Sequence, residues 1–257
     1  MAGFVRAVPP EFVSAAKTRL FLGIRFAASF FLQDYRCVVC SKDSGRSPVC
    51  VECREKYFSV AEPVSSFCSV CGKRLVSEEG TCMECRESPL LMHADSVYSL
   101  YSYRLWNETL LCRWKITGDR GNSFFFAERL STRLKVLFGS EKMPVIVPVP
   151  PRPGKIKKKG WDQVDELVSL LHVFYGFQVR YILERKSGTQ QKTLDRNERL
   201  DTIGKGYSVR KDVRRLPLEV CLIDDVLTTG ATAESCAIKL KAAGVQKVFV
   251  LTLFSVD

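Results

Sequence analysis

Residues 220–237 read VCLIDDVLTTGATAESCA, and three kinds of local structure follow one another in this stretch. The apolar run from Val220 to Ile223 is typical of a short buried strand, and Asp224 and Asp225 come directly after it. A loop rich in threonine and glycine then leads into a helical pattern that Gly244 closes. Because open α/β sheets bind ligands where parallel strands end, this stretch predicts an α/β fold with a binding site at the loop.

The residues of this loop have the chemistry to hold a sugar phosphate. Backbone N–H groups and the start of the following helix can bind a phosphate, threonine hydroxyls add donors, and Gly230 allows a close approach. The two carboxylates are placed to bind sugar hydroxyls. The expected contact residues are Asp224, Asp225, Thr228, Thr229, Gly230, Ala231 and Thr232. No Gly-x4-Gly-Lys-Ser/Thr pattern is present, which excludes an ordinary P-loop.

Further strands and helices alternate around this stretch. The predicted strands cover 96–103, 145–149, 179–183, 220–223 and 248–253, and the predicted helices cover 106–115, 123–138, 162–175 and 233–243. Residues 186–205 are basic and polar and are expected to form mainly a loop. A strand, a helix and a second strand at this spacing form a right-handed parallel crossover. The chain from residue 95 onward is therefore predicted to form a parallel sheet flanked by helices.

Eight of the eleven cysteines form four Cys-x2-Cys pairs in two similar halves. The segment CVVCSKDSGRSPVCVEC from Cys37 resembles CSVCGKRLVSEEGTCMEC from Cys68, which indicates one small unit used twice. Two such pairs supply the four sulfur ligands of a closed tetrahedral Zn²⁺ site, as found in structural zinc centres. We expect two structural zinc ions, with the ligands Cys37, Cys40, Cys50, Cys53, Cys68, Cys71, Cys82 and Cys85.

The eight cysteines can be divided between the two ions in more than one way. The repeat favours one ion for the first four cysteines and one for the last four, but interleaved ligation satisfies the same count. Disulfides are disfavoured, because Arg25 interrupts the apolar run 20–32 and no usable signal peptide precedes the cysteines. The remaining cysteines lie in predicted helices or strands and are expected to be buried as small apolar residues; they are Cys112, Cys221 and Cys236.

The N-terminal residues also indicate how the protein relates to membranes. Residues 11–35 carry apolar side chains at steps of three or four, which predicts a helix that packs on the protein or, alternatively, lies on a membrane surface. The apolar run 20–32 is too short to cross a bilayer core of about 30 Å. A cytoplasmic protein without a membrane span is therefore expected.

Basic side chains exceed acidic ones, and most of the excess lies in the second part of the chain. The net charge is +11, and residues 95–257 carry 27 basic and 18 acidic side chains. This excess favours a polyanionic partner, such as a nucleotide or a nucleic acid. Residues 152–159 hold five basic side chains and no acidic one, although a solvated charge run needs no function. The candidate polyphosphate or nucleic-acid contacts are Lys155, Lys157, Lys158 and Lys159.

The order of these motifs resembles the ComF family of type I phosphoribosyltransferase-like proteins. The family's Pro-Val-Pro element appears within 147–151, its Gly-Phe-Asn-Gln at 160–163, and its later Gln, Leu and Arg as Gln191, Leu194 and Arg199. Asp162 replaces the family's Asn, and Thr202 stands where the later stretch usually has Asn. We expect three parts: a helical leader (1–36), a double zinc-binding segment (37–94) and a phosphoribosyltransferase-like domain (95–257).

The resemblance implies a site for phosphoribosyl pyrophosphate or a related ribose phosphate. Asp224 and Asp225 would hold the ribose hydroxyls, and the loop 228–232 the 5′-phosphate. The pyrophosphate, together with Mg²⁺, would lie at Pro150, Pro151 and Arg152. If the protein is an enzyme, its reaction is a displacement at the anomeric carbon, assisted by positioning and electrostatic stabilisation rather than by a side-chain nucleophile.

The family also implies a link to natural transformation, with DNA-uptake proteins as partners. The alternative function is a non-catalytic protein that binds single-stranded DNA through the same pocket and the basic surface. Three tryptophans could stack on bases, but core positions explain them more simply; they are Trp106, Trp114 and Trp161. The two histidines, His93 and His172, are expected to be structural.

Overall fold

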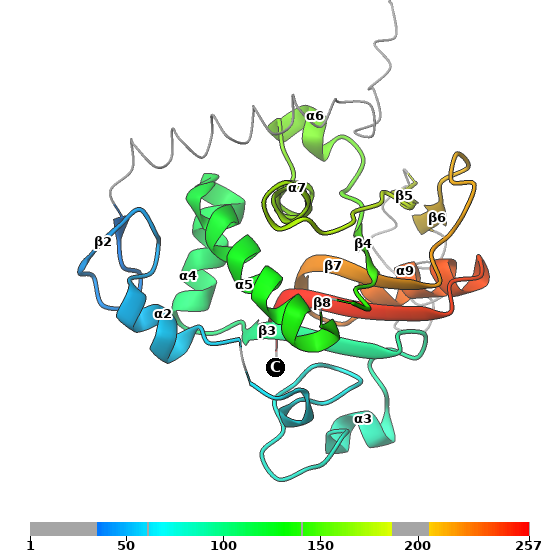
Figure 1. Cartoon of the computed structure of the whole chain (residues 1–257), viewed down its shortest axis with the longest axis horizontal. Helices are drawn as coiled ribbons and strands as arrows, with labels where there is room; N and C mark the ends of the chain where they lie inside the picture. The colour runs from blue at the N-terminus through cyan, green and yellow to red at the C-terminus, as the bar shows by residue number, and fades with distance from the viewer. Residues whose placement is uncertain (1–34, 61, 140, 187–205, 257) are drawn as a thin grey trace, which may run out of the picture.

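The computed structural model describes residues 35–60, 62–139, 141–186 and 206–256. Its centre is a four-stranded parallel sheet flanked by helices, which confirms the predicted α/β fold (Figure 1). The strand order is β3 (Ser96–Ser102), β8 (Lys247–Ser255), β7 (Glu219–Leu227) and β4 (Val145–Pro148). One face packs against α4 (Trp106–Cys112), α5 (Gly121–Phe138) and α7 (Gln163–Tyr175), and the other against α9 (Ala231–Ala242).

Strand β7 divides its apolar side chains between two cores. Cys221 and Ile223 belong to the core beneath α5 and α7, whereas Val220 and Leu222 belong to the core beneath α9. All four side chains are fully buried. Successive side chains of a strand point to opposite faces, so a strand covered on both faces needs an unbroken apolar run. This is why the run at 220–223 identifies a central strand.

The connections after β4 and β7 leave the sheet in opposite directions. The chain after β4 passes through α7 and returns on the far side of β4, where Val179 pairs in parallel with Ile146. The chain after β7 passes through α9 into β8, on the other side of β7. Strands β4 and β7 are parallel neighbours, with Pro148 opposite Ile223. Their carboxyl ends therefore flank a crevice at the point where the topology reverses, which is where open α/β sheets bind ligands.

Two strands differ from the sequence prediction. The strand expected at 179–183 is reduced to the single bridge at Val179, because the chain then leaves β4 and forms the hairpin of β5 (Leu183–Arg185) and β6 (Tyr207–Val209). Strand β7 is longer than expected and includes both aspartates, because β8 runs beside it as far as Ser255. The carboxylates thus lie in the last part of the strand rather than after it.

The helices predicted at 106–115, 123–138, 162–175 and 233–243 are present, with one irregularity. Helix α4 continues into a π-helical turn, η3 (Arg113–Thr117), which ends at Gly118 in the left-handed conformation with a φ of 74°. A π turn inserts one residue relative to an α-helix and changes the direction of the following side chains. Trp114 of this turn is fully buried, and its indole N–H donates to the Ser123 hydroxyl over 2.7 Å. The turn thus fixes Lys115 next to a core residue.

The cysteine-rich part forms two small units that pack differently. The first unit contains β1 (Tyr35–Arg36), β2 (Asp43–Gly45) and α2 (Val51–Tyr57), and its Cys37, Val49 and Cys53 belong to the core beneath α5 and α7. The second unit contains η2 (Val64–Ser66) and α3 (Met83–Glu87) and has a small apolar cluster of its own. Figure 1 shows α2 beside α4 and α5, while α3 lies beyond the edge strand β3. The second unit meets that edge where Val97 N–H donates to the Ser69 carbonyl over 2.9 Å.

Some predictions fall on residues outside the described ranges. They are most of the helix expected at 11–35, the loop expected within 187–205, and the motif residues Gln191, Leu194, Arg199 and Thr202. Within the described ranges, none of the helices combines the length and the apolar character that a bilayer crossing requires.

Candidate functional site

The turn between β7 and α9 brings the predicted phosphate loop to the crevice. Gly230 precedes α9 in the left-handed conformation, with a φ of 70°. Thr228 and Thr229 are exposed, whereas Ala231 and Thr232 are half-buried in the first turn of the helix. The free N–H groups of a helix start and its dipole favour an anion at this position.

Asp225 lies at the centre of a network of polar side chains drawn from three helical segments. Its Oδ2 accepts a hydrogen bond from Gln163 Nε2 over 2.6 Å and pairs with Lys115 Nζ over 2.8 Å. Lys155 Nζ donates to Gln163 Oε1 and lies 2.6 Å from Asp162 Oδ2. The network links α7, η3 and the helix α6 (Lys155–Lys159) to the end of β7.

The two neighbouring aspartates have opposite pKa shifts. Burial tends to raise the pKa of Asp225, but the charge of Lys115 and hydrogen bonds from Lys115 and Gln163 outweigh it and hold the pKa below its usual value. Burial and the adjacent charge of Asp225 raise the pKa of Asp224 to about 8. At neutral pH the pair therefore carries about one negative charge, and Asp224 can donate as well as accept a hydrogen bond.

Asp162 both caps a helix and pairs with a lysine, which explains why an aspartate stands at this position. Its Oδ1 caps α7 by accepting from Val164 N–H and Asp165 N–H, each over 3.0 Å. Its Oδ2 pairs with Lys155, and the side chain is almost fully buried. An asparagine could cap the helix equally well but could not supply the charge that offsets Lys155.

The end of β4 supplies the other wall of the crevice. Val149 N–H donates to the Ile223 carbonyl over 3.0 Å, so the chain that follows runs beside the two aspartates. Pro150 and Pro151 are half-buried, and Arg152 is exposed. The basic segment divides, because Lys155 is engaged in the network while the remaining three lysines are exposed on α6; these are Lys157, Lys158 and Lys159.

The chain that leaves the second cysteine unit packs on the phosphate loop. A Cβ added at Gly230 would lie 3.0 Å from Leu90 Cγ and 3.0 Å from Leu91 Cδ1. Glu234 in the first turn of α9 accepts hydrogen bonds from the backbone N–H groups of Met92 (3.1 Å) and His93 (3.2 Å), and its Oε1 lies 2.6 Å from the His93 ring. His93 is therefore a structural contact, as predicted.

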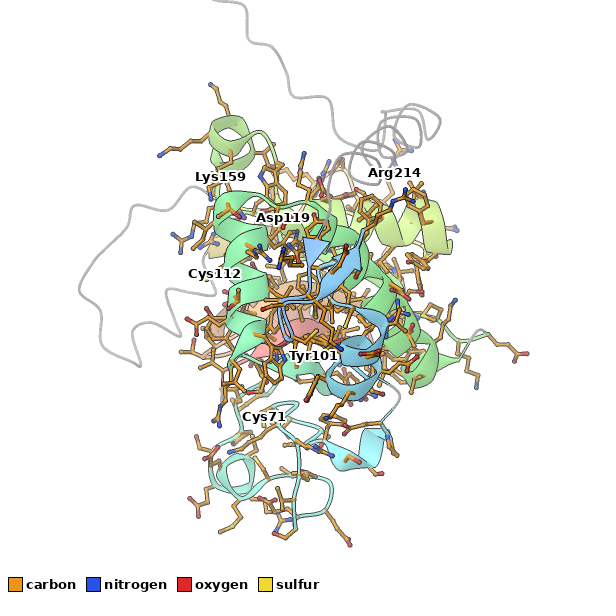
Figure 2. All side chains as sticks on the ribbon, turned by 90° about the vertical axis from the view of Figure 1, so that its left-hand side faces the viewer. Cys71, Tyr101, Cys112, Asp119, Lys159 and Arg214 are labelled. Carbon is orange, nitrogen blue, oxygen red and sulfur yellow. The ribbon has the colours of Figure 1, made fainter. Side chains whose placement is uncertain are left out.

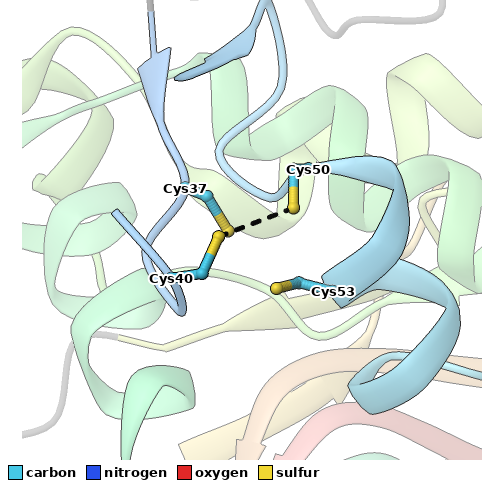
Figure 3. Close-up of side chains that lie close together, drawn as sticks. All are labelled: Cys37, Cys40, Cys50 and Cys53. Atoms are coloured by element: carbon cyan, nitrogen blue, oxygen red, sulfur yellow. Dashed lines mark hydrogen bonds between the residues drawn. The ribbon is translucent and has the colours of Figure 1, made fainter. Parts of the chain in front are cut away.

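The eight paired cysteines form two separate groups in sequential order. One group is Cys37, Cys40, Cys50 and Cys53, and the other is Cys68, Cys71, Cys82 and Cys85; within each group the sulfurs lie within 4.8 Å of one another. Figure 3 shows the first group, with the four sulfur atoms turned toward a common centre. The Sγ atoms of Cys40 and Cys50, and those of Cys71 and Cys82, are 3.8 Å apart. Zn–S bonds of about 2.3 Å in a tetrahedron give a sulfur separation of about 3.8 Å, so both groups suit one such ion each.

The two cysteine units share their backbone construction. Cys37 N–H donates to the Lys42 carbonyl and Cys68 N–H to the Lys73 carbonyl, each over 2.8 Å. The ion pairs Lys42–Glu52 (3.8 Å) and Lys73–Glu84 (3.6 Å) are also equivalent. Burial opposes deprotonation of Cys37, but backbone hydrogen bonds from Cys50, Cys40 and Val39 lower its pKa to about 6. A thiol with this pKa is largely a thiolate at neutral pH, the form that binds metal. The shared backbone contacts show that the sequence repeat is also a structural repeat.

Other residues singled out in the sequence take varied positions. Cys221 and Cys236 are buried as predicted, but Cys112 is only half-buried at the end of α4, where the chain changes to the π turn. Trp114 is a core residue, whereas Trp106 and Trp161 are half-buried, the latter beneath the Arg120 guanidinium. His172 Nδ1 lies 2.9 Å from the Phe177 carbonyl at the end of α7 and is structural.

Lys115 is the site residue that sequence reasoning missed. It reaches Asp225 from the π turn, and no motif or charge pattern around it marks that geometry. The contact of Glu234 with the 92–93 backbone was also missed, because it joins residues more than 140 positions apart.

No family model matches the chain. The competence protein ComFC of Streptococcus pneumoniae (strain ATCC BAA-255 / R6) is 27% identical over 211 residues, which cover 80% of this chain and 87% of that protein. The similarity thus spans most of both chains. Together with the paired cysteines and the acid-acid-Thr-Gly loop, it supports the resemblance of this chain to the ComF family.

Proposed function

We propose that the crevice between the ends of β4 and β7 binds phosphoribosyl pyrophosphate or a related ribose phosphate. The observation that carries this proposal is the reversal of topology between two parallel neighbours, with an aspartate pair at the end of one and a helix start beside it. Sugar hydroxyls need acceptors and donors together, and the unequal protonation of Asp224 and Asp225 offers both.

Each part of the ligand has a proposed partner. The 5′-phosphate binds the N–H groups and hydroxyls of 228–232, the ribose hydroxyls bind the two aspartates, and the pyrophosphate lies at Pro150, Pro151 and Arg152. Mg²⁺ would arrive with the pyrophosphate, and the carboxylate oxygens at the end of β7 are of the type it prefers. We propose two zinc ions for the cysteine groups, which have four sulfurs each and hence a closed, structural character.

If a reaction occurs, this chain contributes positioning and charge. Displacement at the anomeric carbon breaks its bond to the pyrophosphate oxygen, and an acceptor forms the new bond. Fixed N–H donors and the exposed cation of Arg152 would stabilise the charge that develops on the leaving pyrophosphate. The similarity to ComFC supports a role in competence, and we propose that the protein acts in the cytoplasm with DNA-uptake proteins.

Calorimetric titration with phosphoribosyl pyrophosphate and Mg²⁺ tests the proposal. Wild-type protein should bind at millimolar concentration or below, and the double variant Asp224→Ala/Asp225→Ala should bind at least about tenfold more weakly, because it loses charge-assisted hydrogen bonds. Lys135→Gln, on the exposed side of α5, is a control that should bind like the wild type. Equal binding by the double variant would remove the aspartates from the site.

The second candidate is a non-catalytic protein that binds single-stranded DNA, and the exposure of three consecutive lysines on α6 favours it. Neutralising Lys157, Lys158 and Lys159 should reduce the salt slope of binding by about 0.7 for each DNA phosphate that the variant no longer neutralises. DNA binding with an unchanged slope in this variant would exclude α6 as the DNA-binding element. Release of pyrophosphate with some acceptor would favour the enzyme instead.

A further inference from the structure

A second polar cavity lies between the cysteine units and the edge strand β3. Its volume is about 320 Å³, and its walls include Ser59, Phe67, Arg74, Ser99, Asn107 and Arg133. Figure 2 shows Cys71 of the second unit at one end of the molecule and Lys159 of α6 at the other. Gly72 and Lys73 of the second unit also line this cavity, together with Ser255 at the end of β8.

Arg133 is the unusual group in this wall. It comes from the middle of α5, and only 2% of its surface is exposed. Its Nη1 donates to the backbone carbonyls of Val60 (3.3 Å) and Glu62 (2.6 Å), and the guanidinium stacks on the Phe67 ring at 5.0 Å. Its Nη2 is buried and has no hydrogen-bond partner within the described part of the chain. A buried guanidinium with an unused donor is costly unless an acceptor joins it.

No carboxylate is within ion-pair distance of Arg133 among the described residues. The nearest candidate, Glu62, directs its carboxylate to Arg74 Nη2 over 3.3 Å, although its charge partly opposes the lowering of the Arg133 pKa that burial causes. Lys73, the third cation of the wall, pairs with Glu84 over 3.6 Å. Three cations and one carboxylate thus line the cavity, and the serine side chains add hydroxyl donors.

We propose that this inter-unit cavity binds a phosphate-type oxyanion, with Arg133 as the buried anchor and Arg74 and Lys73 at the rim. A guanidinium presents several N–H donors in one plane and binds phosphate oxygens at close range. The anion could come from a free nucleotide or from the backbone of a nucleic acid, because both present the same group. This inference does not rest on the proposed ribose phosphate site, because it uses other residues.

Side-chain NMR of ¹⁵N-arginine protein tests the inference with a signal that belongs to the cavity. Arg133→Lys, which keeps the charge and loses the guanidinium, identifies the Arg133 resonance. Inorganic phosphate is titrated against chloride at constant ionic strength, and the Arg133 signal should move to a plateau. Arg74→Gln and Lys73→Gln should each raise the dissociation constant about three- to tenfold. Phosphate bound at the loop 228–232 would not produce these effects.

The matched control is Lys135→Gln, which makes the same charge change on the exposed side of α5. It should leave the dissociation constant unchanged. An Arg133 signal that does not respond to phosphate, or a loss of affinity in Lys135→Gln equal to that in Arg74→Gln, would overturn the proposal. A stronger response to a thymidine dinucleotide than to a nucleoside monophosphate would support a nucleic-acid backbone as the source, and the reverse order would support a free nucleotide.

Discussion

At the scale of residues, Asp225 and Lys115 form the pair on which the geometry of the crevice depends. Their 2.8 Å contact joins a nearly buried carboxylate to an ammonium from the π turn. Breaking a buried ion pair leaves a charge without a partner, which destabilises far more than the loss of an exposed pair. The half-exposed position of Lys115 reduces this effect.

We predict that Lys115→Gln lowers the free energy of unfolding by about 1–2 kcal/mol at pH 7. Asp225→Asn should lower the free energy of unfolding less in the Lys115→Gln variant than in the wild type, since the two residues share one interaction. Urea unfolding of the single and double variants measures this coupling. Lys157→Gln, which removes an exposed ammonium, serves as the control. Additive effects of the two substitutions would show that the pair does not contribute as proposed.

The raised pKa of Asp224 predicts a pH dependence of stability. Its value of about 8 in the folded protein lies above the usual value of 3.8, so the folded state binds a proton that the unfolded state has lost. The stability from this group is therefore complete below about pH 4 and is lost as the pH rises toward 8. Lys115 and Asp162 act on the same carboxyl in opposite directions, and Asp225 raises its pKa further.

Asp224→Asn should remove this dependence. In metal-loaded protein, the difference in urea midpoint between the variant and the wild type should increase in favour of the variant from pH 5 to pH 8. Asp225→Asn should show a smaller change in the same direction, because it removes the charge that, together with burial, raises the pKa of Asp224. A constant difference between Asp224→Asn and wild type across the range would contradict a raised pKa.

At the scale of elements, the sequence predicts what is local. The run at 220–223 and the loop after it identified β7, α9 and the turn between them, because strand burial and helix starts depend on neighbouring residues. The strand predicted at 179–183 is wrong beyond Val179, because pairing with β4 competes there with the hairpin of β5 and β6. Lys115 and Leu90 could not be predicted, since they reach the site through a π turn and through the packing of a distant unit.

The contact of Leu90 with the phosphate loop gives a prediction about α9. Gly230→Ala should destabilise the protein by about 1–3 kcal/mol, because the added methyl meets both leucines and the residue keeps a positive φ. Gly176→Ala is the matched control, with a φ of 75° at the end of α7 and open space around the added carbon. Leu90→Ala should restore part of the stability that Gly230→Ala removes. Equal thermal midpoints for the two glycine variants would show that the leucine contact is unimportant.

At the scale of the whole molecule, the two cysteine units relate differently to the sheet. The first shares its core with α5 and α7, whereas the second has a separate apolar cluster that joins the larger domain through Leu90 and the edge of β3. Unfolding of the first unit should therefore affect the whole fold, and unfolding of the second should remain more local.

Purified protein should contain two zinc ions per chain, because each cluster offers four sulfurs at tetrahedral spacing. Cys40→Ser and Cys71→Ser should each remove one ion, and Cys40→Ser should lower the thermal midpoint more. Elemental analysis and circular dichroism measure the two effects. Wild-type protein that is free of metal after purification without chelators, or one ion in place of two, would contradict the assignment.

The crevice between β4 and β7 is tested most directly by a crystal structure with phosphoribosyl pyrophosphate and Mg²⁺. The 5′-phosphate should accept hydrogen bonds from the backbone N–H groups at the start of α9, and the ribose hydroxyls should contact Asp224 and Asp225. The pyrophosphate should lie beside Pro150–Arg152. A ligand bound elsewhere on the protein, with these residues unchanged and the crevice filled only by solvent, would contradict the proposed site.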